Sequence, residues 1–409
     1  MSKAPQRDVL ITGIGLVSSL GDGLDSHRDA LNAPGGPKPV VDRESCAPYP
    51  IHPLVEVDFD KQIPKRGDQR QMEAWQRIGT YAAGLALDDA GIKGETDILS
   101  RTDMIVSAGG GERDTEVDSA ILTDLLTTNN PGQLLNERLS NDLRPTLFLA
   151  QLPNLLAGNI SIVHKVTGSS RTFMGEEAAG IDAVRTAHAR VAAGQSEICL
   201  VGGSYNAERL DMLLLFELGN YLWREDWLPV WDRLQDAGHG NAGMITGSMG
   251  AFLVLESPEH AEARGATPIA KIDAVLSDRC KREPGQAAAV ARRQFDALRP
   301  KLGNSPTAIL TGATGAQPAS AEEREFLTGL LAGDIDGSVR AVGSMIGHGL
   351  EAQFPALVAI AAMTAAERRL YPPVDGTGLE TDTKAPIDQV LVNMWGHWRG
   401  EGMALVSPV

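Results

Sequence analysis

Short apolar runs alternate along the chain with longer stretches in which apolar residues recur at helical spacing. The short runs are rich in β-branched residues and several end in glycine, a pattern typical of buried strands. In the first part of the chain they predict strands at 9–15, 103–107, 171–174, 198–201 and 247–255. Helical spacing predicts helices within 17–32, 71–90, 112–150, 178–193 and 258–265, whereas the proline-rich text at 40–69 predicts irregular surface.

A second series of the same kind begins near residue 268. It predicts strands at 269–274, 308–312, 390–393 and 403–406, with helices at 286–302, 321–331 and 354–366. Each series contains a turn with one polar side chain, Glu177 or His348, followed by an alanine-rich helix. The repetition predicts an internally duplicated α/β fold with halves 1–256 and 257–409, in which both helix N-termini meet at one pocket.

The stretch 171–183 is the strongest candidate site. An extended run ends at Met174, and Gly175 separates it from a helix that opens with Glu176 and Glu177. A sharp strand-to-helix turn exposes one side chain at the positive end of a helix. Here that side chain is a glutamate. The triple glycine at 109–111 lacks the Gly-Lys-Ser/Thr ending of a phosphate loop and predicts a tight turn instead.

Composition and charge limit the function classes. With 409 residues, 43% hydrophobic, the chain can bury a large core, and its formal charge of −16 argues against nucleic acid or an anionic membrane as partner. Cys46, Cys199 and Cys280 are too widely spaced to suggest a disulfide framework or a zinc site. No run reaches the roughly 20 apolar residues of a membrane span. We therefore expect a cytoplasmic globular protein without a metal.

Four separated segments resemble the β-ketoacyl-acyl-carrier-protein synthases, the elongating condensing enzymes of fatty acid and polyketide synthesis. They are VLITGIGLVSSLGDGLDSHRDAL at 9–31, residues 195–203, GSMGAFLVLESPEHAEARGA at 247–266 and SMIGH at 344–348. The resemblance implies a duplicated thiolase-like αβαβα five-layer fold and a dimer. It also implies an acyl carrier protein as partner and no cofactor.

The family's chemistry requires a cysteine nucleophile and two histidines, and the resemblance places these slots on altered residues. The nucleophile slot falls on Glu177, or on Glu176 if the register slips by one. The first histidine slot falls on Gly312, or on Ala313 in a shifted register. A family lysine corresponds to Gly343. Of the three catalytic side chains only the second histidine is retained, as His348.

The resemblance also indicates which residues would face substrate. These are Thr314, Asn393 and the segment that replaces the family's phenylalanine gate, Gly396, His397 and Trp398. His239 lies in a loop that the family uses near the pocket, although a plain turn is the simpler interpretation. The tryptophans at 223, 227 and 231 could face acyl chains, but covering the core is the commoner role.

Three hypotheses for function remain. The first, which we favour, is a non-condensing subunit similar to chain-length factors, which lack the cysteine and pair with an active ketosynthase. The second is an autonomous decarboxylase or hydrolase of malonyl or acyl thioesters that uses Glu177 as a base. The third is a homodimer that binds acyl chains or carrier protein without turnover. Paralogues of ketosynthases also occur beside dedicated carrier proteins in operons for very long acyl chains, and such a setting would suit this chain as a partner subunit.

Overall fold

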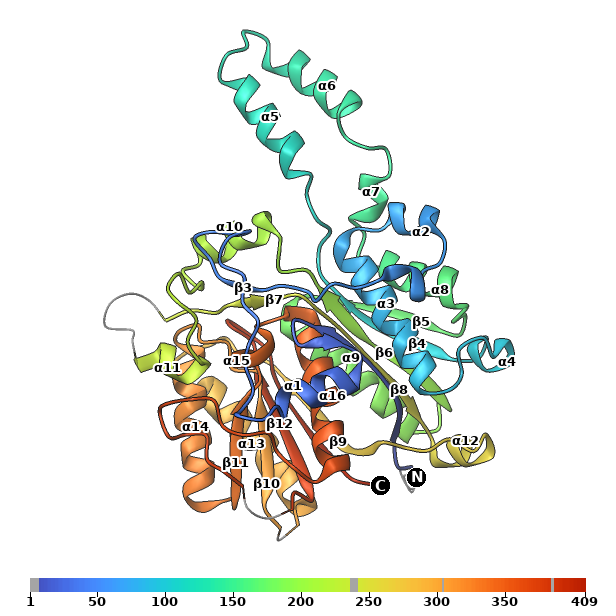
Figure 1. The fold of residues 1–409 in the computed structure, drawn as a ribbon, viewed down its shortest axis with the longest axis vertical. Helices are drawn as coiled ribbons and strands as arrows, with labels where there is room; N and C mark the ends of the chain where they lie inside the picture. Colours follow the sequence, from blue (N-terminus) through green and yellow to red (C-terminus); the bar gives the residue numbers. More distant parts are fainter. Residues whose placement is uncertain (1–6, 236–241, 304, 384–385) are drawn as a thin grey trace.

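The computed structural model describes residues 7–235, 242–303, 305–383 and 386–409. Its main sheet has eleven strands, ten of them on one path in the order β11-β10-β12-β13-β9-β1-β8-β6-β4-β5, with β2 paired to β1 (Figure 1). The strands are β1 (Leu10–Ser18), β2 (Gly21–Asp22), β4 (Asp103–Ala108), β5 (Ser170–Met174), β6 (Ile198–Tyr205), β8 (Met249–Glu256), β9 (Ala270–Asp278), β10 (Thr307–Thr311), β11 (Gly337–Ala341), β12 (Gln389–Trp395) and β13 (Glu401–Ser407). Two short strands, β3 (Ile51–His52) and β7 (Thr246–Gly247), form a separate ladder.

The strand pairings repeat. In the first half β4 lies parallel to β5 and β6, while β8 is antiparallel to β6 and β1. In the second half β10 lies parallel to β11 and β12, while β13 is antiparallel to β12 and β9. The antiparallel pair β1 and β9 joins the two sets. The duplication predicted from the sequence is therefore present, although the residue at which the halves are divided stays a prediction.

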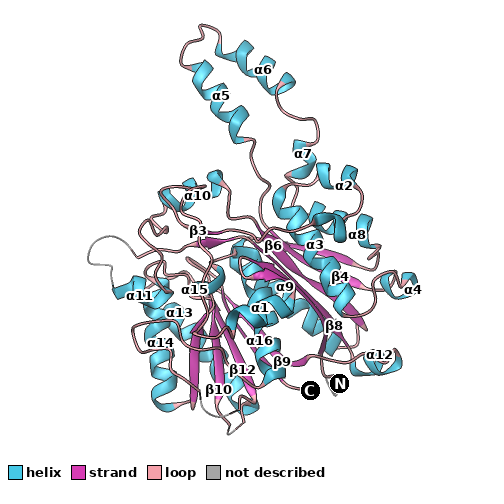
Figure 2. Ribbon diagram, in the orientation of Figure 1, coloured by secondary structure: helices cyan, strands magenta, loops and turns pink. Residues whose placement is uncertain are grey.

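Helices cover the outer faces of the sheet and fill the space between its halves (Figure 2). The inner layer is α9 (Glu176–Ala192) and α16 (Gln353–Glu367), which touch each other and strands of both halves. Outside the first half lies α3 (Ala74–Asp89), and outside the second lie α13 (Gln286–Leu298) and α14 (Ala319–Gly333). These helices and the two halves of the sheet make the five layers that the sequence predicted.

The layers approach closely where glycine replaces larger residues. A Cβ on Gly15 of β1 would lie 1.9 Å from the carbonyl oxygen of Ala82 in α3. Any side chain there would force strand and helix apart. The inner layer is equally tight, since every residue of α16 from Gln353 to Ala365 is buried. The helices at the centre thus form a rigid support for residues at their N-termini.

The remaining helices lie around this core. They are α1 (Leu24–Leu31), α2 (Arg66–Gln71), α4 (Thr96–Leu99), α5 (Thr115–Leu125), α6 (Pro131–Asn141), α7 (Leu147–Ala150), α8 (Leu155–His164), α10 (Leu210–Leu218), α11 (Val230–Gln235), α12 (Pro258–Ala263), α15 (Gly343–Ile346) and the 3-10 turns η1 (Phe59–Lys61), η2 (Arg299–Lys301) and η3 (Leu350–Ala352). The pair α5 and α6 projects away from the rest of the molecule (Figure 1). No helix among the described residues is both long and apolar enough to cross a bilayer.

The structure corrects some sequence-based expectations. The strand β11 was not predicted, because its text, GSVRA, is short and contains an arginine. The segment 40–69 is less irregular than expected, since it includes β3, η1 and the start of α2. Cys46, which lies in the proline-rich segment predicted as irregular surface, is buried. His239 lies outside the described residues.

Candidate functional site

The strand-to-helix turn lifts Glu177 into the centre of the molecule. The chain leaves β5 through Gly175, whose φ of 116° favours glycine, and Glu176 follows with a φ of 45°. A left-handed φ at a non-glycine residue is a strained turn. Glu177 then stands in the first turn of α9 and is fully buried. The sequence predicted this turn but an exposed side chain; Glu177 is instead buried, because His348 and His397 lie against its carboxylate.

His348 comes from the second half of the chain. It follows α15 and Gly347, and its main chain is fixed by bonds to both sides: its N–H donates to Ile245 O at 2.9 Å and its carbonyl accepts from Gly247 N at 2.9 Å. Its Nε2 lies 2.8 Å from Glu177 Oε1. The two polar side chains that repeat in the sequence, Glu177 and His348, therefore meet as expected.

His397 closes the cluster from the loop after β12. Both its Nδ1, at 2.8 Å, and its main-chain N–H, at 2.9 Å, contact Glu177 Oε1. Its ring packs edge-on against Phe216 and Tyr221, with centroid distances of 5.5 and 4.8 Å. Gly396 permits the approach, because a Cβ there would lie 3.0 Å from Glu177 Oε2. The sequence placed His397 at the mouth of a pocket; the structure places it against Glu177.

The two histidines determine the ionisation of the cluster. Burial opposes the charged form of Glu177, but His397 and His348 outweigh it and hold its pKa well below the usual range. Burial likewise opposes a charge on His397, yet the Glu177 carboxylate raises the pKa of that imidazole. Glu177 is thus a stabilised carboxylate, which is a poor general base and a poor nucleophile.

A second buried carboxylate, Glu351, was missed by sequence reasoning. It belongs to η3, and its Oε1 accepts from Glu176 N at 3.2 Å. Burial raises its pKa to about 7, and the nearby Glu177 contributes in the same direction. A Cβ on Gly109 would lie 2.7 Å from Glu351 Oε1. Its position three residues after His348 was the one available signal in the sequence.

Gly312 leaves no space for the imidazole that the family carries in this slot. A Cβ added to Gly312 would lie 2.8 Å from Met394 Cγ and 3.1 Å from Leu357 Cδ1. Gly343 stands in the slot of the family lysine, and a Cβ added to it would lie 3.1 Å from Ala313 O. A side chain at position 312 would therefore require Met394 to move, whereas a Cβ at position 343 would make only a tight contact with one carbonyl oxygen. Ala313, the alternative first slot, is itself buried.

Two predicted substrate-facing residues bond elsewhere. Asn393 donates from Nδ2 to Glu323 Oε1 at 2.6 Å, and Thr311 donates to the same oxygen. Burial raises the pKa of Glu323 to about 8. Thr314 accepts from Ala316 N at 3.0 Å, a local turn contact. Asn393 thus belongs to a polar cluster around Glu323 in the second half, and Thr314 stabilises its own loop.

Trp398 lies at the surface end of the site. It is 44% exposed, its Nε1 donates to Glu176 Oε2 at 2.6 Å, and Arg399 stacks on its ring at 4.5 Å. A pocket of about 220 Å³ adjoins it, lined by Tyr221, Lys281, Arg282, Gln317, Pro318, Ala319, Glu322, His397 and Trp398. Trp398 and His397, two of the predicted substrate-facing residues, both line this pocket, and their contact with substrate stays a prediction.

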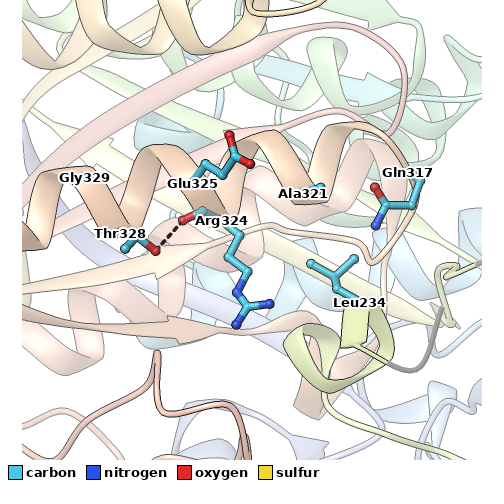
Figure 3. Close-up of a pocket in the computed structure, with 7 residues that line it drawn as sticks. All are labelled: Leu234, Gln317, Ala321, Arg324, Glu325, Thr328 and Gly329. Carbon is cyan, nitrogen blue, oxygen red and sulfur yellow. Dashed lines mark hydrogen bonds between the residues drawn. The ribbon is translucent and has the colours of Figure 1, made fainter. Parts of the chain in front are cut away.

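Another pocket, of about 560 Å³, is lined mainly by residues of α14 (Figure 3). It is lined by Leu234, Gln317, Ala321, Arg324, Glu325, Thr328 and Gly329. Figure 3 shows Arg324 and Glu325 pointing away from each other, with Thr328 bonded to the Arg324 carbonyl at 2.8 Å. The pocket has no contact with Glu177 among its lining residues and contributes no chemistry to that site.

The three thiols are not arranged as replacements for the missing nucleophile. Cys199 is fully buried in β6, and burial raises its pKa. Burial also raises the pKa of Cys46 and of Cys280. Cys280 Sγ lies 3.5 Å from Glu401 Oε1, a carboxylate that favours the neutral thiol. The tryptophans at 223 and 231 are buried in the core, as the commoner role predicted.

Comparisons with known proteins agree with this geometry. A family model described as beta-ketoacyl synthase, N-terminal domain, matches residues 6–261. The 3-oxoacyl-[acyl-carrier-protein] synthase 2 of Vibrio cholerae is 25% identical over 276 residues, 65% of this chain and 62% of that protein. The oxytetracycline polyketide putative beta-ketoacyl synthase 1 of Streptomyces rimosus is 27% identical over 396 residues, 94% of this chain and 90% of that protein. The match thus spans less than two thirds of the Vibrio relative.

Solved structures share the whole fold. The structure titled "The ishigamide ketosynthase/chain length factor" superposes with a TM-score of 0.78 at 21% identity, covering 99% of this chain and all of that one. A beta-ketoacyl synthase from Burkholderia phymatum gives a TM-score of 0.75 at 21% identity, covering 98% of this chain and 100% of that one. The fold and the strand-to-helix turn define a thiolase-like protein. Within that class, the chain belongs to the β-ketoacyl synthase family.

Proposed function

We propose that this chain is a non-condensing subunit of fatty acid or polyketide synthesis, which pairs with a ketosynthase that keeps its cysteine. The observation that carries the proposal is the state of Glu177. A condensing enzyme needs a thiolate in this slot to hold the acyl group as a thioester. Here the slot holds a carboxylate that accepts from His348 and His397 and whose pKa lies well below its usual range.

The loss of the first histidine supports the same proposal. Decarboxylation of a malonyl unit forms an enolate whose oxygen needs donors. Gly312 supplies no side chain, and Met394 and Leu357 fill the space where one would lie. His348, the remaining histidine, is already bonded to Glu177. Neither the acyl-transfer step nor the decarboxylation step therefore has its expected machinery.

The outer edge of β5 supports assembly with a second subunit. This strand ends the sheet, and its residues are largely exposed, including Met174 at 67%. Large apolar side chains are also exposed nearby in the sequence, at Phe148, Leu152 and Ile162. An unpaired strand edge flanked by apolar side chains is a natural surface for pairing with another chain. A ketosynthase-like partner placed there would lie next to Gly175 and Glu176.

An acyl carrier protein is the proposed delivery partner. One solved structure of similar fold, titled as a type II polyketide synthase acyl-carrier protein in complex with its ketosynthase, has a TM-score of 0.71. In this chain Lys281 and Arg282 line the pocket beside His397 and Trp398. Cations at that mouth would favour an acidic carrier and its phosphate-linked arm.

The alternative of an autonomous thioester hydrolase is less well supported. A general base works best with a pKa near the working pH, and Glu177 is shifted away from that range. Glu351, with a pKa raised to about 7, is closer to such a value. However, Glu351 is buried behind Glu176 and bonds to its main chain. A homodimer that binds acyl chains without turnover is the third alternative. The acylation assay described next distinguishes it from the other two.

The test is an acylation assay read by intact mass and by product analysis. The purified chain is incubated with acyl- and malonyl-carrier protein, alone and together with a ketosynthase encoded beside it. We expect no covalent adduct and no turnover for the chain alone. With the ketosynthase present we expect condensation, and a change in product length relative to the ketosynthase alone.

Two results would contradict the proposal. Turnover by the chain alone that is abolished in E177Q but retained in E176Q would make it an enzyme that uses Glu177. Saturable acyl binding by a homodimer, with no effect on any ketosynthase, would leave it a binding protein.

A further inference from the structure

Three buried donor atoms from distant parts of the chain converge without a thiol. They are Glu177 Oε1, His348 Nε2 and His397 Nδ1, and all lie within 4.8 Å of one another. We infer that Glu177, His348 and His397 form a binding site for a divalent transition-metal ion of the zinc type. The inference goes beyond the proposed function, which requires no metal.

The spacing of the donors fits such an ion. Each histidine nitrogen lies 2.8 Å from Glu177 Oε1. Metal–ligand bonds of about 2.0–2.1 Å in a tetrahedral site place the donor atoms roughly 3.3 Å apart. The observed separations are therefore within small side-chain rotations of a coordination triangle. Two imidazoles and one carboxylate also match the ligand preference of zinc, cobalt and ferrous iron rather than that of magnesium or calcium.

A second observation points to a missing ligand at the same place. Glu177 Oε2 and His348 Nδ1 are buried and have no hydrogen-bond partner among the described residues. Oε1 receives three contacts, from His348 Nε2, His397 Nδ1 and His397 N, while Oε2 receives none. A buried carboxylate oxygen without a partner is costly. An ion that binds both oxygens of the Glu177 carboxylate would give Oε2 the partner that it lacks, whereas His348 Nδ1, on the other side of its ring from Nε2, would not take part.

The scaffold holds the donors ready. Glu177 is fixed by the first turn of α9, and the main chain of His348 is bonded to Ile245 and Gly247. The His397 ring is held between Phe216 and Tyr221. Preorganised ligands lose little freedom when they bind an ion, which favours affinity. The pocket that adjoins His397 and Trp398 gives an entry path from solvent.

Binding must displace protons. The nitrogens that now contact Glu177 Oε1 become lone-pair donors to the ion, so any proton held between histidine and carboxylate leaves for the second ring nitrogen or for solvent. Coordination would fasten the loop after β12 to the start of α9, across the two halves of the fold. In a subunit without a catalytic thiol, the ion would serve as a structural clamp at the inactive slot.

The test uses the full chain without an affinity tag, stripped of metal with a chelator. Zinc is titrated by calorimetry, and cobalt by its visible ligand-field absorption. We expect one ion per chain, no thiolate charge-transfer band with cobalt, and a rise in melting temperature on adding zinc but not magnesium. H397Q and E177Q should each weaken binding by at least about 100-fold and remove the zinc-dependent rise in melting temperature.

The matched control is C280S. Cys280 is the partly exposed thiol, and through Glu401 and Arg282 it is linked to the same loop, since Arg282 Nη2 donates to the Gly396 carbonyl at 2.8 Å. C280S should bind zinc like the wild type. Absence of binding to the folded wild type, binding that survives H397Q, or a thiolate band that C280S abolishes would each overturn the inference. These readouts do not depend on acyl transfer, so they fail or succeed separately from the proposed function.

Discussion

The two ends of the sheet are corresponding strands in a duplicated fold, yet one is closed and the other open. The outer strand of the second half, β11, is buried along four of its five residues. The segment 371–383 covers it: Glu380 Oε1 accepts from Ala341 N at 2.8 Å, and Arg340 Nε donates to Tyr371 O at 2.8 Å. The outer strand of the first half, β5, is exposed at three of its five residues. No strand among the described residues pairs with its outer side.

The connections that lead to these edges differ in the same way. One helix, α14, links β10 to β11, and the Glu323 side chain of this helix is buried. The link from β4 to β5 instead contains α5, α6, α7 and α8, of which α5 and α6 project outward (Figure 1). Leu122 and Leu126 on this projection are 66% and 86% exposed. The edge of the second half is covered by its own chain, whereas the first half leaves its edge strand open and carries exposed apolar side chains on a projection that extends away from the sheet.

The difference between the covered edge at β11 and the open edge at β5 indicates which end of the sheet is available to a partner. Unpaired strand edges are normally covered or blocked because they attract other chains. In the second half the chain covers its own edge strand, because the segment 371–383 lies over β11. The first half places its open edge directly before Gly175 and Glu177, so a subunit docked on β5 would lie at the altered nucleophile slot. The experiments below act on one edge at a time.

The largest effect is expected from M174D at the open edge. A buried aspartate without a partner would cost the assembly about 4 kcal/mol, or roughly 1,000-fold in affinity. The monomer should keep its melting temperature, since Met174 is 67% exposed. Assembly with a ketosynthase partner is measured by light scattering and by titration. V409D, at another exposed apolar residue, is the control and should assemble normally. Assembly by M174D at wild-type affinity would show that β5 is not the interface.

The matching change at the closed edge, E380A, should act on the fold instead. Glu380 Oε1 and Oε2 accept from Ala341 N at 2.8 Å and Val374 N at 3.0 Å, and removing the carboxylate leaves the buried N–H of Ala341 and the partly buried N–H of Val374 unpaired. We expect a loss of about 2–3 kcal/mol in the free energy of unfolding. Urea denaturation measures it, with D382N as a control at an exposed neighbour. A wild-type unfolding curve for E380A would mean that the cover over β11 contributes little.

Most of the fold could be predicted because its signals are local. Buried strands such as 198–201 and 103–107 contain apolar runs and begin where predicted; β4 ends one residue later than predicted and β6 four residues later, at Tyr205. The missed strand β11 contains Arg340, whose side chain is satisfied by carbonyls of a segment about 30 residues later in the chain. Such tertiary compensation leaves no periodic pattern in the sequence. The same holds for Cys46, whose burial depends on distant neighbours.

The site could be predicted only in part, for a related reason. Glu177 and His348 were found because each stands at a turn before an alanine-rich helix. His397 was expected at the pocket mouth, but nothing in its sequence context showed that its ring would turn toward Glu177. Asn393 was expected near substrate, whereas burial of Glu323 draws its amide toward the second half. Glu351 was missed, since a buried acid in an apolar stretch is identified only by what surrounds it.

The smallest effect is expected from E323Q, which tests how fully the second connection is buried. Burial raises the pKa of Glu323 from its ordinary value of 4.5 to about 8. The folded state therefore holds this proton more tightly than the unfolded state, and the wild type loses stability as pH rises from about 4.5 toward 8. Glutamine keeps the oxygen that accepts from Asn393 and Thr311 but cannot ionise. We expect E323Q to match the wild type near about pH 4.5 and to be about 2 kcal/mol more stable near about pH 6. Urea denaturation across this range gives the difference, and E325Q, at the exposed glutamate of the same helix, should follow the wild type.

A difference that does not change with pH would mean that Glu323 is ionised in the folded protein, and that α14 is more open to water than its buried face indicates.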